Sequence, residues 1–505
     1  MKITPVLLSS LALSLAESTS NLPGLLQNIS STVFSQLRDT SRDIWENPEL
    51  GLLEFHAHDV TIEYFQALDV WEVTPHAFGM ATAVAAEFEN RPDGFNGDIP
   101  TVGFIGEFDA LPGVGHACGH NLLWLNAVLA SRLAAEALVE LGIPGKILLR
   151  ITPDEENGAG KNTVEQHAGF DDANIWLMAH PAPANAFAPG NVRLNLFSSF
   201  KRDTHYDAVK ATYQGMLSVH DLADLPGTAS SVALIEEVSD WAVNVIQQQI
   251  GLGISGTTVD TVHKTVSSIL DATYPNVTYT VENGVDGVDL MLHGPGGHAS
   301  ANSNGPLVLS IEVFRRLSGD SSLSFYLPQN TTQKELGFVS DIRTRYDTDI
   351  NAIAKVVSDA IDGADSITSD IIYPEFEVDP YLASFMTELL ATDAYGSSNF
   401  VTTDSALAAT DASLVQQPEI DPNTKRLLSV AKVVLQPLFN ICENPTTCGT
   451  NHEPLFAQFT GTDFAFNKTE IMGRAQAHTA VLLLTDPEMM TAATALIRSK
   501  GVITN

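Results

Sequence analysis

The sequence has little positive charge and no long apolar run beyond its first residues. It holds 26 lysines and arginines against 61 aspartates and glutamates, a formal net charge of −35 at pH 7. Nucleic acids and anionic membranes bind proteins through basic surfaces, so we expect neither as a partner. A membrane-spanning helix needs about 18 or more consecutive apolar residues, and no such run follows residue 16.

Two common hydrolase motifs are also missing. The chain has neither a Gly-x-Ser-x-Gly nucleophile motif nor a glycine-rich phosphate-binding loop. The sequence therefore indicates neither hydrolysis by a serine nucleophile nor nucleotide hydrolysis. The composition is that of an ordinary globular protein, with 505 residues, 44% of them hydrophobic, and a mean hydropathy of +0.06. This length predicts two domains rather than one.

The first residues are typical of a secretory signal. Lys2 precedes a run from Val6 to Leu15 that is apolar apart from serines, and Ser14-Leu15-Ala16 is a small-x-small cleavage site. We therefore expect a signal peptide at residues 1–16 and a secreted, extracellular protein; a buried N-terminal helix is the alternative. Asn-x-Ser/Thr triplets that predict a glycoprotein begin at Asn28, Asn276, Asn330 and Asn467.

Cysteine is scarce, and its three copies divide into a pair and a single residue. Cys442 and Cys448 are close enough for a local disulfide in an oxidising compartment. Cys118 is left unpaired, two positions before His120 in a glycine-rich turn. A thiolate and an imidazole at this spacing can share one or two cations and suit zinc. A buried cysteine beside helix-capping histidines is the structural alternative.

Strand-like and helix-like segments alternate around this turn. Apolar strands are predicted at 101–106, 146–152 and 175–179, and an Ala- and Leu-rich helix at Leu122–Leu141. This order predicts an open α/β sheet, in which ligands bind beyond the carboxyl ends of the strands. The residues that follow these three strand ends are Cys118 and His120, Glu155 and Glu156, and His180. Cysteine, histidine and glutamate ligands should therefore meet at one edge of the sheet.

The adjacent glutamates predict a division of labour. Neighbouring side chains that leave a strand point to opposite sides, so one carboxylate can bind metal while the other accepts a proton from an activated water. We assign Glu156 to the metal and Glu155 to the general base. A solvated acidic loop is the alternative, and it is disfavoured by the glycines that follow and the ligands that precede the pair.

Three motifs resemble the peptidase M20 family, in its branch of metal-dependent amidohydrolases and dipeptidases with a cysteine ligand. They are Asp109-Ala110-Leu111-Pro112 with Gly115-His116-Ala117-Cys118-Gly119-His120-Asn121, then Pro153-Asp154-Glu155-Glu156-Asn157-Gly158-Ala159-Gly160-Lys161, and Met178-Ala179-His180-Pro181. The resemblance covers most of residues 35–185 and weakens towards the C-terminus. It implies an α/β fold, with a zinc-peptidase-like catalytic domain interrupted by an α+β lid that often mediates dimers.

The resemblance also implies a site with two divalent metals. Zinc is expected, with manganese or cobalt as alternatives, bound by Cys118, His120, Glu156, His180 and one histidine near the C-terminus. Asp109 would hold a ligand in orientation, and Glu155 and Asp109 are the catalytic candidates. For the last ligand we choose His478, in Ala477-His478-Thr479, with His452 in reserve, because only 14 residues separate Asp463 from His478 and the family stretch is generally longer.

The expected domains are 17–187 and 379–505 for the two parts of the catalytic domain and 188–378 for the lid. The family's lid motif resembles the segment Gly296-Gly297-His298-Ala299-Ser300. The resemblance makes His298 the candidate substrate-binding residue, because the lid histidine of the family reaches a catalytic centre, commonly that of the partner subunit.

Strands are predicted in the lid at 208–215, 288–295, 336–345 and 371–378, and helices at 307–317 and 349–361; a further helix is suggested at 425–435. The lid is larger than usual. Residues 217–220 could be a degraded second copy of the motif, so His220 is the alternative to His298. The structural alternative is that His298, in a glycine-rich turn, is simply exposed to solvent.

These features predict a secreted hydrolase that cleaves amide bonds in dipeptides, short peptides or N-acyl amino acids. Water activated by the metals would attack the carbonyl, with Glu155 as the base. The resemblance implies a homodimer through the lid. A catalytically inactive M20-like binding protein is the alternative, favoured by the short spacing before His478 and by the enlarged lid, and opposed by the five retained motif residues.

Overall fold

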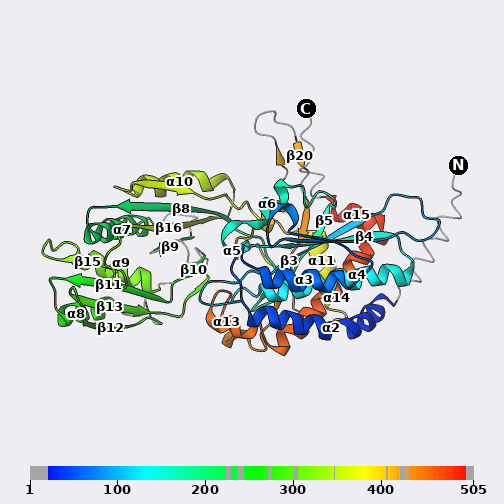
Figure 1. The fold of residues 1–505 in the computed structure, drawn as a ribbon, viewed down its shortest axis with the longest axis horizontal. Helices are drawn as coiled ribbons and strands as arrows, with labels where there is room; N and C mark the ends of the chain where they lie inside the picture. Colours follow the sequence, from blue (N-terminus) through cyan, green and yellow to red (C-terminus); the bar gives the residue numbers. More distant parts are fainter. Residues whose placement is uncertain are drawn as a thin grey trace.

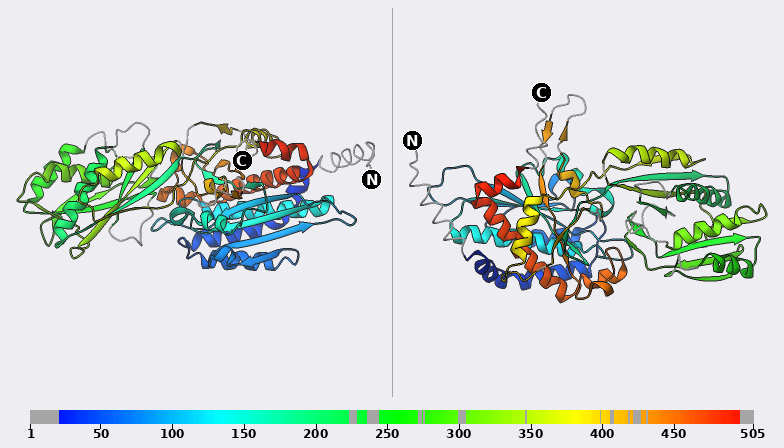
Figure 2. Two further views of the ribbon diagram at one scale, coloured as in Figure 1. Left: turned by 90° about the horizontal axis from the view of Figure 1, so that it is seen from above. Right: turned by 180° about the vertical axis from the view of Figure 1, so that it is seen from behind.

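The structure is a computed structural model with two lobes (Figure 1). It describes residues 21–222, 229–235, 244–270, 274, 276–298, 305–345, 347–397, 399–404, 408–417, 419–420, 427–429 and 432–495. The segment predicted to be a signal peptide lies outside these residues. One lobe is built from the two ends of the chain and the other from its middle, and the two lobes lie end to end in all three views (Figures 1 and 2).

The larger lobe is centred on a six-stranded sheet of order β1-β2-β4-β3-β5-β21. The strands are β1 (Glu72–Pro75), β2 (Val84–Asn90), β4 (Gly145–Thr152), β3 (Thr101–Glu107), β5 (Ile175–Leu177) and β21 (Val433–Leu435). The last four are parallel, whereas β1 and β2 are antiparallel. The carboxyl ends of β3, β4 and β5 therefore share one edge, as the sequence predicts.

Helix α4 (His120–Leu141) is the central helix of this lobe. It lies between the sheet and the helices α2 (Leu22–Glu46) and α14 (Asp463–Thr485), so almost all its side chains are buried. Gly142 ends it in a left-handed conformation, with φ of 62°. Among the described helices α4 alone has the length and composition of a membrane span, and 83% of that window is buried inside the fold. Its apolar character therefore comes from its place in the core.

Further helices complete this lobe. They are α3 (Phe55–Gln66), α5 (Glu155–Gly158), α6 (Gly160–Gln166), α11 (Pro380–Leu390), α12 (Ala412–Val415), α13 (Pro454–Phe459) and α15 (Pro487–Ala493). A small four-stranded sheet lies beside the main one, with β18 (Val401–Thr402), β7 (Ala186–Phe187), β22 (Leu438–Asn440) and β6 (His180–Ala182) in order. The predicted helix at 425–435 is wrong where the structure describes it, because β21 continues the main sheet next to β5.

The smaller lobe, the lid, contains two four-stranded antiparallel sheets (Figure 1). The first has the order β17 (Ser366–Ser369), β8 (Val192–Lys201), β16 (Glu335–Thr344) and β9 (Ala229–Ile235). The second has the order β12 (Thr278–Asn283), β13 (Val288–His293), β11 (Gln249–Ser255) and β15 (Ser324–Tyr326). The lid helices are α7 (His205–His220), α8 (Val259–Ile269), α9 (Pro306–Leu317) and α10 (Asp347–Ala360).

Two lid elements differ from the sequence-based expectation. Residues 208–215, predicted as a strand, form the middle of α7, which Thr204 caps by accepting a hydrogen bond from the Asp207 backbone N–H. Residues 371–378, also predicted as a strand, carry only an isolated bridge between Tyr373 and Arg193. The last strand of the lid is instead β17, which pairs with β8.

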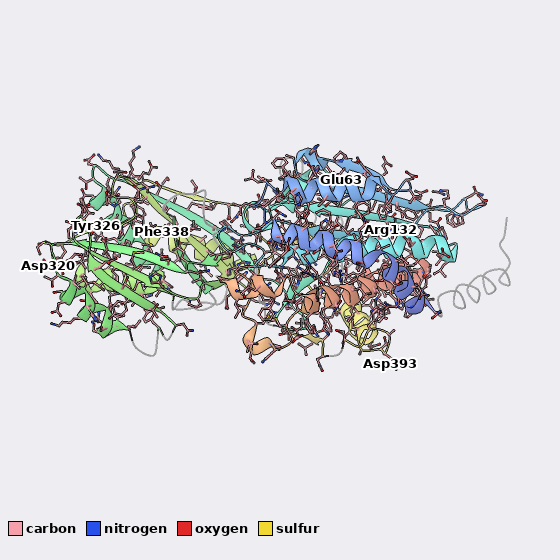
Figure 3. All side chains as sticks on the ribbon, turned by 60° about the horizontal axis from the view of Figure 1, so that its bottom comes forward. Glu63, Arg132, Asp320, Tyr326, Phe338 and Asp393 are labelled. Carbon is pink, nitrogen blue, oxygen red and sulfur yellow. A yellow bond between two sulfur atoms is a disulfide. The ribbon has the colours of Figure 1, made fainter. Side chains whose placement is uncertain are left out.

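Each lobe has its own hydrophobic core. Phe338 and Tyr326, labelled at the lid end in Figure 3, are buried there, with 1% and 2% of their surfaces exposed. The largest cluster of the larger lobe, named the catalytic lobe after the expected catalytic domain, is built around α4 and the main sheet. One continuous cluster fills the lid and joins both of its sheets. Each lobe therefore has a core of its own, as a domain requires.

Candidate metal and active site

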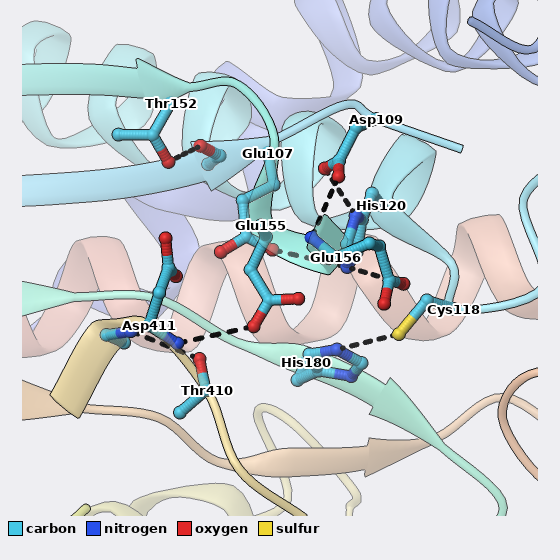
Figure 4. A network of polar contacts seen from close by, with 12 residues as sticks. Glu107, Asp109, Cys118, His120, Thr152, Glu155, Glu156, His180, Thr410 and Asp411 are labelled. Carbon is cyan, nitrogen blue, oxygen red and sulfur yellow. Dashed lines mark hydrogen bonds and ion pairs between the residues drawn. The ribbon is translucent and has the colours of Figure 1, made fainter. Parts of the chain in front are cut away.

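The Cys118 turn leads directly into α4. Gly119 is the residue before the helix and has φ of 87°; a Cβ there would lie 2.5 Å from Cγ of Pro181. Only glycine fits both requirements, and the close approach brings the turn against the segment that carries His180. Cys118 Sγ and His180 Nε2 are consequently 3.4 Å apart (Figure 4).

Asp109 holds two of the predicted ligands together. Its Oδ1 is 2.8 Å from Nδ1 of His120, and its Oδ2 accepts a hydrogen bond from the Glu156 backbone N–H at 3.1 Å. This leaves Nε2 of His120 as the ring atom directed towards Oε1 of Glu156, 3.8 Å away. Asp109 is fully inside the protein, with 1% of its surface exposed, and fixes the orientation of the imidazole.

Glu155 and Glu156 are presented by a strained turn rather than by a strand end. After β4 the chain forms the single helical turn α5, and the flanking residues Asp154 and Ala159 have φ of 59° and 52°. Non-glycine residues in this left-handed region store strain and concentrate at functional sites. Helix geometry rather than strand alternation positions the two carboxylates, and one oxygen of each lies within 4.8 Å of the other and of a ring nitrogen of His120.

Glu155 lies over a buried charge network. Its Oε1 accepts a long hydrogen bond, 3.4 Å, from the Asp411 backbone N–H (Figure 4). Below it Lys161 binds both Asp411, at 2.6 Å, and Glu107, and all three side chains are enclosed. Burial, reinforced by the Glu107 and Asp411 carboxylates, raises the pKa of Glu155 well above its usual range. A carboxylate in this setting has a high affinity for a proton, as a general base requires.

His452 is brought to the site by a loop that follows a disulfide. Cys442 and Cys448 are bonded, which confirms the predicted local pair, and Cys118 is the free thiol. After Cys448, Asn451 donates hydrogen bonds to the backbone oxygens of Cys118 and Pro181, at 3.2 and 3.1 Å. The loop thus fastens onto the Cys118 turn and places Nε2 of His452 3.4 Å from Oε1 of Glu156.

Glu156 and His452 form a closely coupled pair. Although burial alone would raise it, His452 and His120 hold the pKa of Glu156 well below its usual range. Burial alone would lower the pKa of His452, but the effect of Glu156 and Cys118 is larger and raises this pKa to about 10. The second oxygen of Glu156, Oε2, accepts a hydrogen bond of 2.5 Å from the Asn244 side chain. Asn244, which the sequence analysis missed, therefore fixes Glu156 from the opposite side.

His478 does not lie with the other predicted ligands. It is in the continuous helix α14, fifteen residues after Asp463, or roughly 22 Å along the helix axis. Its Nδ1 is 2.9 Å from the hydroxyl of Tyr395, and it is in none of the described groups of convergent donors, whereas His452 is. The choice of His478 over His452 is therefore corrected: Thr462 and Asp463 begin a helix that carries His478 away from the sheet edge.

The burial of His478 predicts a specific pH dependence of stability. Burial lowers the pKa of His478 to about 4, so the unfolded chain binds the proton more readily between pH 6.5 and 4. The free energy of unfolding therefore decreases by up to about 3 kcal/mol as the pH falls through this range. In metal-free protein, His478→Gln should remove this part of the pH dependence, measured by urea unfolding at pH 7 and 4.5. The same dependence in wild type and variant would contradict it.

The donor set fits a pair of divalent cations. Cys118, His120 and His180 form one group whose donor atoms all lie within 4.8 Å of one another, and Cys118, Glu156 and His452 form a second. Three of these buried atoms form no hydrogen bond in the described part of the chain, although both ring nitrogens lie within ion-pair distance of the carboxylate oxygen: His120 Nε2, His452 Nε2 and Glu156 Oε1. Unsatisfied buried polar atoms are costly, and a cation would satisfy all three. Cys118 belongs to two of the convergent groups, and a third contains His120, Glu155 and Glu156.

A cavity of about 280 Å³ opens beside these donors. Cys118, Glu155, Glu156, His180 and His452 line one side of it. The lid contributes His298, whose ring centroid is 4.3 Å from that of His452. His220, the alternative lid histidine, instead lies near Glu312 and Arg315 on the lid helices. The structure therefore brings His298, and not His220, to the site.

Sequence comparison identifies relatives for part of the chain. An Xaa-Arg dipeptidase of Homo sapiens is 39% identical over 155 residues, 29% of this chain and 35% of the relative. A p-aminobenzoyl-glutamate hydrolase component of Escherichia coli is 28% identical over 160 residues, 28% of this chain and 32% of the relative. The match thus spans about a third of the curated relatives' length. No family model matches the chain.

Comparison of folds extends over nearly the whole chain. An aminobenzoyl-glutamate utilization protein of Klebsiella pneumoniae superposes with a TM-score of 0.50 at 12% identity, covering 92% of this chain and 99% of the other. A dinuclear metal-binding M20 peptidase of Bacillus subtilis gives a TM-score of 0.47 at 13% identity, covering 90% and 99%. The first of these similarities shows that the two-lobed architecture is a shared fold.

Proposed function

We propose, on the premise that its site motifs and its fold are those of the peptidase M20 family, that this chain is a metal-dependent hydrolase of amide bonds. The observation that carries the proposal is the convergence of the buried donor atoms of His120, His452 and Glu156 around the free thiol of Cys118. A buried donor set of this kind is built to hold cations.

Each residue of the site has a distinct task in this proposal. Cys118, His120, His180, Glu156 and His452 hold the metals, and Asp109 keeps His120 in orientation. When bound, two divalent cations supply Lewis-acid polarisation of the amide carbonyl and lower the pKa of water. Glu155 takes the proton of the attacking water and passes it to the departing amine. His298 is placed to stabilise the oxyanion that forms on the carbonyl.

The cavity favours an apolar substrate group beside the scissile amide. Its other lining residues are mostly apolar and small: Pro181, Ala182, Pro183, Ala188, Pro189, Phe376, Ala408, Ala409 and Leu438. Among the described residues its acidic side chains are only Glu155 and Glu156. The human relative is named for an arginine substrate, and a guanidinium needs a carboxylate partner. Dipeptides, short peptides or N-acyl amino acids with apolar groups are therefore the proposed substrates.

A hydrolysis panel tests both the reaction and the substrate class. Purified protein with zinc, manganese or cobalt should cleave apolar dipeptides and N-acyl amino acids with kcat/KM at least about tenfold above that for Xaa-Arg dipeptides, or about 1.4 kcal/mol. Metal content is measured on the same samples, with Glu155→Gln as the control. A protein that binds none of the supplied metals and shows no Glu155-dependent turnover would support the inactive binding protein instead. A preference for Xaa-Arg dipeptides would overturn the assignment of apolar substrates.

Secretion is proposed together with this activity. The support is the Cys442–Cys448 disulfide, because disulfides form and persist in oxidising compartments. A homodimer through the lid stays a prediction.

A further inference from the structure

The two sheets of the lid are the same supersecondary unit. The outer repeat runs β8-α7-β9 and then β16-α10-β17, and its sheet has β17-β8-β16-β9 in order. The inner repeat runs β11-α8-β12-β13-α9-β15, and its sheet has β15-β11-β13-β12 in order. Numbered along each repeat, both sheets read 4-1-3-2, and every pairing is antiparallel. The enlarged lid therefore contains two βαββαβ units.

One repeat is inserted within the other. In the inner repeat the second and third strands form a hairpin that connects Asn283 to Val288. The corresponding strands of the outer repeat, β9 and β16, pair directly, but the chain between Ile235 and Glu335 contains the whole inner repeat. An insertion at a hairpin tip leaves the host sheet intact.

The two repeats share one hydrophobic core. The ring of Tyr213, on α7 of the outer repeat, lies 5.3 Å from that of Phe314, on α9 of the inner repeat. The hydroxyl of Tyr213 donates a hydrogen bond of 3.2 Å to Ser310 on the same inner helix. These buried contacts belong to the continuous hydrophobic cluster of the lid, so the outer repeat fixes the position of the inner one.

The inner repeat reaches the catalytic lobe through a short ribbon. We define the ribbon as residues 244–246 and 297–298, which include the paired strands β10 (Val245–Ile246) and β14 (Gly297–His298). From this ribbon, the Asn244 side chain donates a hydrogen bond to Glu156, and the Asn244 backbone oxygen lies 3.1 Å from Nδ1 of His452. The ring of His298 lies 4.3 Å from that of His452, centroid to centroid. Every one of these contacts joins the lid and the metal-site residues of the same chain.

We propose that the inner repeat is an internal substitute for a second lid. It delivers Asn244 and His298 to the site of its own chain, so one chain holds a complete active site and needs no partner subunit for catalysis. The resemblance to the M20 family implies a partner's histidine at this place, and here the chain supplies that group itself. The geometric part of the inference is independent of the proposed function, whereas its catalytic part rests on it.

An isotope-labelled cross-link tests the geometry without using activity. His298→Cys and His452→Cys are introduced together in a Cys118→Ser background, and equal amounts of unlabelled and ¹⁵N-labelled protein are mixed, unfolded, refolded and oxidised. The linked peptides that carry positions 298 and 452 should be uniformly light or heavy, like the native Cys442–Cys448 pair, which serves as the internal control. Linked peptides of mixed label would overturn the proposal, and so would a folded protein without the 298–452 link.

A mixing experiment tests the catalytic part. Glu155→Gln damages only the catalytic lobe and His298→Ala only the lid, so the two variants are refolded together. Completion within one chain predicts no activity above the sum of the separate variants, whereas a site shared between two chains would restore roughly a quarter of wild-type activity. Restored activity would overturn the inference. Inactive wild-type protein would instead refute the proposed function, and the cross-link would still decide the geometry.

Discussion

Replacement of Glu155 by glutamine should slow turnover severely and leave the metal site in place. The variant keeps the size of the side chain and an oxygen facing the cavity, but an amide cannot accept a proton from water. General acid–base catalysis contributes roughly 10²–10⁴-fold to rate, so kcat should fall by about that factor while KM changes little. Steady-state kinetics on the best substrate of the panel, with metal analysis of the same samples, measures both quantities.

The surroundings of Glu155 explain why its loss should affect rate rather than folding. Its carboxylate makes one long hydrogen bond, from Asp411, whereas the buried lysine beneath is satisfied by Glu107 and Asp411 without it. The exposed Glu443 provides the matched control, and Glu443→Gln should retain wild-type kcat. Wild-type kcat in Glu155→Gln, at equal metal content, would remove Glu155 from the mechanism.

The parts of the site that the sequence predicted are those that lie next to regular elements. Cys118 and His120 follow β3 at the start of an apolar helix, and Glu155 and Glu156 follow β4. In a parallel sheet, strand ends meet at one edge whatever the tertiary details. Local sequence was therefore enough to bring these residues together, and the structure differs only in placing the glutamates on a single helical turn.

The remaining site residues depend on contacts between distant segments. His452 lies in a loop without regular structure, and what brings it to the site is the binding of Asn451 to the Cys118 turn, 333 residues away in sequence. Asn244 reaches Glu156 only through the ribbon of the inner repeat. A sequence signal for His452 did exist, because it closely follows Cys448 of the predicted disulfide, whereas nothing local marks Asn244.

The lid shows the same limit at the level of architecture. Its helices at 306–317 and 347–360 and its strands at 288–293 and 335–344 follow the predicted boundaries closely, because each has a clear apolar pattern. The duplication of the βαββαβ unit was not predicted, since it is visible in strand order and not in repeated residues. The enlarged lid, which from sequence weakened the case for an enzyme, is explained by the inner repeat.

The two C-terminal histidines should differ sharply in their effect on metal binding. His452→Ala removes a donor atom 3.4 Å from Glu156 and should weaken metal binding beyond the roughly 10–100-fold that loss of a ligand's supporting partner costs. His478→Ala is the matched control, since its histidine bonds Tyr395 in the core; it should keep wild-type metal affinity and lose about 1–3 kcal/mol of stability. Competition with a chromophoric chelator measures affinity and urea unfolding measures stability. Loss of metal in His478→Ala with full occupancy in His452→Ala would reverse the assignment when urea unfolding shows that both variants are folded, because the effect would then come from the metal site and not from loss of the fold.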